Sequence, residues 1–156
     1  MTPLLIAALA LLGLIAGIYV SALIHDWRIG DLSPAQYTAM HQMRDKTFRR
    51  VMPVIGLATV ALVAASAALA VDPGLPRMLA WIAASLLIAI IALTVMRQVP
   101  LNERVQSWTE ATIPADWTHV RDQWASQHQV RTALCLLAYA CLLGAVLLML
   151  DGAGNA

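Results

Sequence analysis

The chain has 156 residues, of which 60% are hydrophobic and 12% are charged, and its mean hydropathy is +0.72. A soluble domain of this size is about half apolar and about one quarter charged. So few polar groups cannot coat a water-soluble globule, and the same numbers exclude an intrinsically disordered chain. The net charge of +1 provides no strong field for nucleic acid, so we expect no such partner. The composition indicates a small integral membrane protein whose first partner is the lipid bilayer.

Four apolar runs without an internal ionisable residue predict membrane-spanning helices at residues 4–24, 54–71, 78–96 and 132–150. The first run could be a secretory signal, because Val20-Ser21-Ala22 fits a cleavage site. It is longer than a usual signal core and no basic residue precedes it, so we predict an uncleaved span. Gly13 and Gly17 place small residues on one face of this span, which favours close helix packing. The expected fold is all-α, a single domain forming an up-down-up-down membrane four-helix bundle.

The basic residues indicate the orientation of the bundle. Of the ten Lys and Arg residues, nine lie in the two long connections, at residues 25–53 and 97–131. Only Arg77 lies in the short turn between the second and third spans. The positive-inside rule therefore predicts that both long connections are cytoplasmic and that both termini lie outside. We expect the protein in a bacterial cytoplasmic membrane.

Both long connections have helical sequence patterns. Ser33-Pro34-Ala35-Gln36 is typical of a capped helix start, and a helix from there is predicted to run to Pro53. Its recurring face contains Tyr37, Met40, His41, Arg44 and Phe48. The second connection predicts a short helix over residues 101–109, which carries Asn102, Glu103 and Trp108. A longer helix is predicted to begin at Ile113-Pro114 and to continue into the fourth span.

One face of this longer helix carries the most informative residues of the chain. Steps of three and four residues connect Trp117, Arg121, Trp124, His128, Arg131 and Cys135. Because this face continues the inward face of the fourth span, it predicts a polar, aromatic-walled cavity at the cytoplasmic end of the bundle. Membrane-interface anchoring by Trp and Arg is the alternative interpretation. His25, His41, Asn102 and Glu103 are expected at the same depth.

The motif Pro100-Leu101-Asn102-Glu103-Arg104, followed by a series of tryptophans and basic residues, resembles the anthrone oxygenase-like family of small membrane proteins. The matching positions are Asn102, Trp108, Trp117, Arg121, Trp124, His128 and Arg131. The resemblance implies a four-helix membrane bundle and, from characterised members, oxidation of anthrones to anthraquinones with dioxygen. The expected partners are therefore a hydrophobic, aromatic or phenolic small molecule and dioxygen.

An anthrone carries an acidic C–H, and a base that removes this proton leaves an electron-rich enolate. His128 is the first candidate for the base and His41 the second, because histidine titrates near neutrality. Arg121 and Arg131 could stabilise developing negative charge. The full catalytic set that we predict is His128, Arg121, Arg131, His41 and Asn102, and the predicted substrate-binding set is Trp108, Trp117, Trp124 and Tyr37.

Several alternatives remain open at this point. His25, His41, His128 and Glu103 could hold iron, copper or zinc, although the chemistry could equally need no cofactor. A non-catalytic membrane assembly subunit and a quinone- or haem-binding redox protein are alternative functions, and a homo-oligomer is also open. A proton-coupled transporter is disfavoured because no span contains an ionisable residue.

Overall fold

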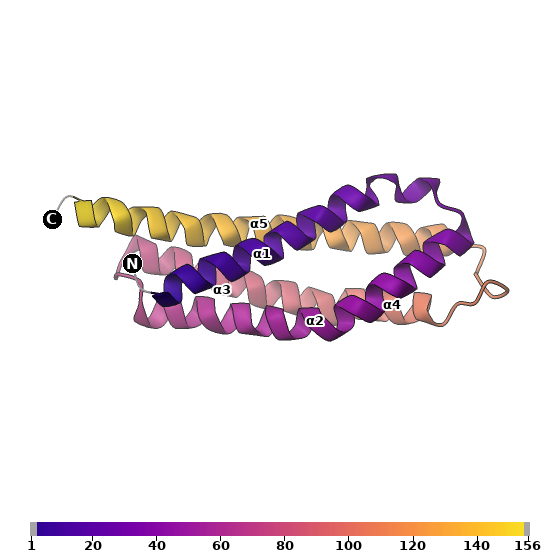
Figure 1. The fold of residues 1–156 in the computed structure, drawn as a ribbon, viewed down its shortest axis with the longest axis horizontal. Coiled ribbons are helices and arrows are strands. Elements are labelled where there is room, and N and C mark those ends of the chain that lie inside the picture. Colours follow the sequence, from indigo (N-terminus) through magenta and orange to yellow (C-terminus); the bar gives the residue numbers. More distant parts are fainter. Residues whose placement is uncertain (1–2, 155–156) are drawn as a thin grey trace.

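Four long helices dominate the computed structural model, which describes residues 3–154 (Figure 1). They are α1 (Pro3–His25), α2 (Pro34–Leu69), α3 (Leu75–Leu93) and α5 (Trp117–Gly154). Shorter elements are the 3₁₀ segment η1 (Asp26–Asp31), the π-helical segment η2 (Thr94–Gln98) and α4 (Val99–Gln106). The described residues contain no strand, which confirms the all-α prediction. Four helical segments are long and apolar enough to cross a membrane.

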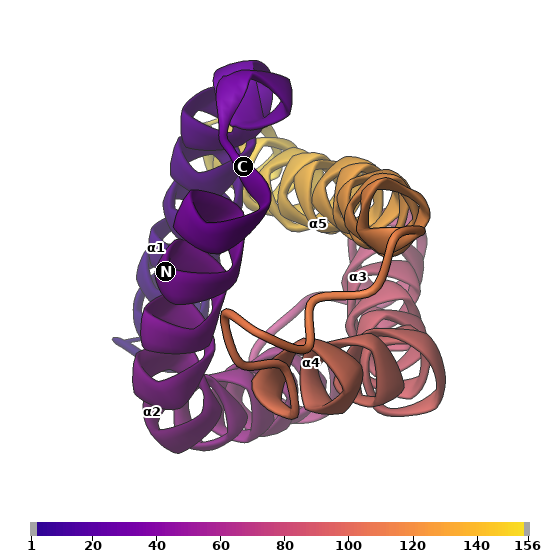
Figure 2. The same ribbon diagram turned by 90° about the vertical axis from the view of Figure 1, so that its right-hand side faces the viewer.

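The long helices form a closed ring. α1 packs against α2 and α5, α2 packs against α3, and α3 packs against α5 (Figure 2). The α2–α3 turn and both marked chain ends lie at one end of the bundle, while the α1–α2 and α4–α5 connections lie at the other (Figure 1). We call this second end the polar end. Contacts of Thr94 with Arg131 and of Asn102 with Trp124 show that η2 and α4 run antiparallel to α5.

Apolar side chains lie both inside and outside the bundle. Leu12, Val63 and Leu142 are fully buried in the core, whereas the outer faces expose Leu14, Leu57, Ile88 and Leu137. Exposed apolar surface of this extent fits lipid rather than water. At Gly13 a Cβ atom would lie 3.2 Å from the ring of Tyr139, so this glycine lets α1 approach α5 closely. Gly17 faces nothing within 4 Å, so only the first glycine of the predicted pair makes a helix contact.

α2 joins the first polar connection to the second span in one helix of 36 residues. Its predicted capping box is confirmed: Gln36 N donates to Ser33 Oγ, and Ser33 N donates to Gln36 Oε1. Pro53 lies inside the helix, and α2 changes direction near its middle (Figure 1). Proline cannot donate the usual backbone hydrogen bond, which explains a bend here.

The second connection differs from its predicted boundaries. α4 follows η2 without a break and ends at Gln106, and α5 begins at Trp117. Between them, Thr109 N donates to Thr112 Oγ1, and Thr112 N donates to the Thr109 carbonyl. Side-chain hydroxyls that bond a nearby backbone compete with helix formation, so the helix before this turn ends earlier than predicted and the helix after it begins later.

Candidate functional site

Buried polar side chains gather at the polar end, between α2, η2, α4 and α5. Trp124, His128 and Arg131 on α5 are 7%, 4% and 8% exposed, as the inward-facing pattern predicted. Polar residues of α2 and η2 are also buried, and they include Thr38, His41, Asp45 and Gln98. Anchoring at the membrane interface would leave such side chains at the protein surface, so their burial favours a polar site in the interior of the bundle.

Asn102 connects three helices through its side-chain amide. Its Oδ1 accepts hydrogen bonds from Trp124 Nε1 at 2.7 Å and from His41 Nε2 at 3.2 Å. Its Nδ2 donates to Asp45 Oδ1 at 2.7 Å. Asp45 Oδ2 in turn accepts from Arg49 and from Gln106, both at 3.0 Å. The amide therefore fixes the relative positions of α2, α4 and α5.

Sequence reasoning missed Asp45 and its neighbour Gln42. Gln42 Nε2 donates to the carbonyl oxygens of Val105 and Trp108, each at 2.9 Å, and so ties α2 to the end of α4. Asp45 lies one helical turn beyond His41, on the same face of α2. That spacing is a signal that could have identified it.

His128 is held between α1 and its own helix. Its Nε2 donates to the backbone carbonyl of Tyr19 at 3.1 Å, and its Nδ1 accepts from Arg131 Nη2 at 3.2 Å. Arg131 Nη1 also donates to Thr94 Oγ1 at 3.0 Å. This pattern requires the neutral imidazole with its proton on Nε2, because a carbonyl accepts and a guanidinium donates.

Trp124 lies at the centre of an aromatic and cationic stack. Its ring stacks on His128 with 5.3 Å between centroids, and His41 meets it edge-on at 5.2 Å. The guanidinium of Arg44 lies 4.4 Å from the centre of the Trp124 ring. Such cation–π and ring contacts hold the indole in one orientation.

Both inward histidines lie outside the four predicted spans and are difficult to protonate. Burial, and then the nearby Arg44, lower the pKa of His41 to about 4. Burial and Arg131 lower the pKa of His128 to about 4. Burial raises the pKa of Tyr37, whose hydroxyl lies 3.4 Å from His41 Nδ1, to about 12. Near neutral pH these three groups are therefore uncharged.

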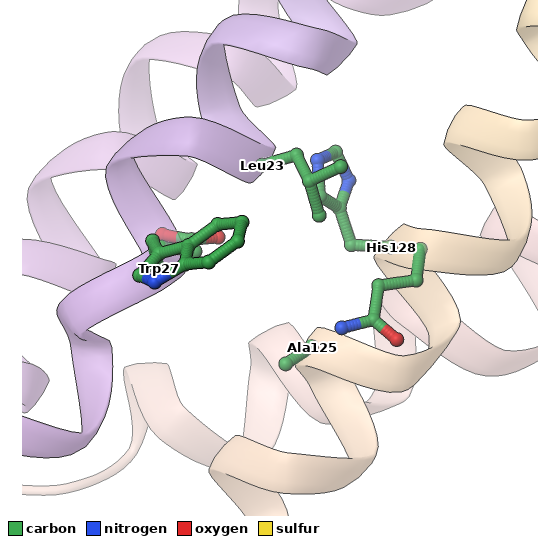
Figure 3. A pocket seen from close by; sticks show the side chains of 6 residues that line it. Leu23, Trp27, Ala125 and His128 are labelled. Atoms are coloured by element: carbon green, nitrogen blue, oxygen red, sulfur yellow. The ribbon is translucent and has the colours of Figure 1, made fainter.

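A pocket of about 350 Å³ opens between the end of α1, η1 and α5. Leu23 and Trp27 lie on one side, and Ala125 and His128 lie on the other (Figure 3). Asp26 and Gln129 complete the lining. Trp27 is 86% exposed, whereas the Asp26 side chain is only 7% exposed and forms an ion pair with Arg44 at 2.6 Å.

Of the predicted catalytic and substrate-binding residues, only His128 lines this pocket. Tyr37 and Trp108 are buried in a separate apolar cluster with Val105 and Val120, against which Trp117 packs. Arg121 is partly buried, forms an ion pair with Asp122, and lies 5.1 Å from the centre of the Trp117 ring. The pocket residues that sequence reasoning did not include are Leu23, Asp26, Trp27, Ala125 and Gln129.

The predicted metal ligands do not come together. His25 is exposed and bonds the Ser21 carbonyl of its own helix, and Glu103 is exposed on α4. His128 stacks on Trp124 and His41 meets it edge-on, and both histidines bond protein partners through both ring nitrogens. Across residues 3–154, no group of three or more His, Cys, Asp or Glu side chains has an arrangement that could hold a metal ion.

These features define a four-helix membrane protein with a buried histidine, tryptophan and arginine site beside a pocket. Residues 40–141 match the anthrone oxygenase family. The match includes all of α3, η2 and α4, and it extends along α5 as far as the middle of the fourth span. The chain belongs to this family. No curated protein and no solved structure matches it.

Proposed function

We propose that this protein is a membrane oxygenase that uses dioxygen to convert the methylene group of a flat phenolic ketone into a carbonyl. In such a reaction one molecule of dioxygen is consumed, one oxygen atom enters the product and the other leaves as water. Family membership supports the oxygenase class. The observation that carries the proposal is the pocket of about 350 Å³ beside His128, within the usual size range of small-molecule sites.

The composition of the pocket suits this substrate class. Leu23, Trp27 and Ala125 offer an apolar and aromatic surface to a flat ring system, while Asp26, His128 and Gln129 offer polar groups. The pocket lies at the polar end, next to the start of the apolar spans, so a hydrophobic substrate could enter from the bilayer. We propose that this end faces the cytoplasm.

The buried network behind the pocket has a positioning role in this proposal. Trp124 stacks on His128, and Asn102 holds Trp124 through its indole nitrogen. Arg131 holds the imidazole of His128 from its other side. A small displacement of a residue that lines an active site can lower the rate by about 10²-fold, so we expect turnover to depend on this network.

The test is turnover by the purified protein in detergent. With an anthrone and air, we expect oxygen uptake and quinone absorbance to rise together in a one-to-one ratio, above a protein-free detergent blank. His128→Ala should lower this rate by about 10²-fold. His119→Ala, an exposed histidine of the same helix, is the matched control and should retain the wild-type rate. Wild-type protein that does not exceed the blank would contradict the oxygenase proposal, and full activity of His128→Ala would contradict the position of the site.

A further inference from the structure

The ion pair of Asp26 and Arg44 leaves two buried polar atoms unused. Arg44 Nη1 donates to Asp26 Oδ1 at 2.6 Å. Asp26 Oδ2 and Arg44 Nη2 are both buried and have no hydrogen-bond partner among the described residues. The side chains are 7% and 19% exposed, so solvent contact is small. One carboxylate acceptor and one guanidinium donor are therefore left over in the same ion pair.

An ordered water molecule or a ligand would supply the missing partners of these atoms. Leaving a buried polar atom unpaired costs about 1–3 kcal/mol, and more when the group is charged. Asp26 is also one of the residues that line the pocket, together with Ala125 and His128. A ligand that donates a proton or a hydrogen bond to Oδ2 would remove this cost.

The two buried histidines near the pocket have both ring nitrogens engaged. His128 donates from Nε2 to the Tyr19 carbonyl, and its Nδ1 lone pair accepts from Arg131. His41 donates from Nε2 to Asn102, and its Nδ1 lies against the Tyr37 hydroxyl. Among the pocket-lining side chains, Asp26 alone is an anion with an uncommitted oxygen.

From this geometry we infer that Asp26 Oδ2 is the base that takes the acidic proton of a C–H or O–H acid conjugated to a carbonyl. The substrate C–H bond breaks, the proton goes to Oδ2, and the electron pair stays in the substrate as its enolate. Arg44 keeps the carboxylate in place through Nη1 and lies on the Trp124 ring at 4.4 Å, which makes it the positioning residue. This inference rests on the proposed function for the identity of the substrate, and the proton transfer itself needs no dioxygen.

The experiment measures proton transfer apart from oxidation. The protein in detergent is incubated with an anthrone in D₂O without oxygen, and deuterium entry into the methylene group is followed by NMR above the buffer rate. Asp26→Asn can still accept from Arg44 but has no carboxylate, so exchange should fall by about 10²- to 10⁴-fold. Asp31→Asn, which changes an exposed carboxylate of the same η1 segment, is the matched control and should exchange at the wild-type rate.

A second variant separates proton transfer from folding. Asp26→Ala removes the carboxylate and leaves space, so formate should restore part of the exchange whereas chloride should not. A purely structural role of Asp26 would show no such rescue. Wild-type exchange at the buffer rate, or Asp26→Asn exchange at the wild-type rate, would overturn the inference. Wild-type protein that exchanges deuterium but takes up no oxygen in air would contradict the oxygenase proposal and leave the role of Asp26 intact.

Discussion

Replacing Asn102 with alanine tests whether its amide holds the polar end together. The substitution removes the acceptor of two buried donors, Trp124 Nε1 and His41 Nε2. Each unpaired buried donor costs about 1–3 kcal/mol, so the free energy of unfolding should fall by about 2–6 kcal/mol. The substitution also removes the donor to Asp45 Oδ1, which adds to this loss, whereas Asp45 Oδ2 retains Arg49 and Gln106 as donors.

The assay is reversible unfolding of the purified protein in mixed micelles, followed by tryptophan fluorescence. Glu103→Ala is the matched control, because it truncates an exposed side chain at the next position of α4. A surface change of this kind stays within about 0.5 kcal/mol of wild type. If Asn102→Ala unfolded as Glu103→Ala does, the hydrogen bonds of the amide would contribute nothing net, and the role assigned to Asn102 would be refuted.

Two further predictions concern pH and orientation. The native pKa of His41 and of His128 is about 4, below the unfolded value of 6.5, so the unfolded state binds protons first as the pH falls. The free energy of unfolding should therefore be at its full value above pH 6.5 and fall by about 2 kcal/mol for each histidine by pH 5. In an unfolding series between pH 7 and pH 5, His41→Gln should halve the slope of this free energy against pH. An unchanged slope would contradict the prediction. An alkaline phosphatase reporter fused to the C-terminus should be active outside the cytoplasm, since the basic residues gather in the two long connections; a reporter that works only in the cytoplasm would reverse the predicted orientation.

Local patterns were sufficient for the elements and for part of the site. The capping box at Ser33 was predictable because its two hydrogen bonds join residues three apart. The inward face of α5 was predictable because helical periodicity places Trp124, His128 and Arg131 on one side, and all three are buried. The spans followed from hydropathy alone, since lipid tolerates few polar groups along a helix.

The pocket could not be predicted in the same way. Asp26 and Arg44 are 18 residues apart, and their pairing depends on where η1 lies relative to α2. Asn102 and Asp45 are 57 residues apart, and their contact depends on the packing of α4 against α2. Tyr37, Trp108 and Trp117 were predicted to bind substrate because aromatic residues suit a flat ring, but they pack with one another in a separate apolar cluster.

The sequence by itself determined that this chain is a helical membrane protein and which face of its last helix is buried, because hydropathy and periodicity are properties of single segments. Only the tertiary structure decided which of the buried polar groups satisfy one another and which remain unpaired. That distinction depends on distances between helices, and it places an unused carboxylate oxygen of Asp26 beside the pocket while both ring nitrogens of His128 are already engaged.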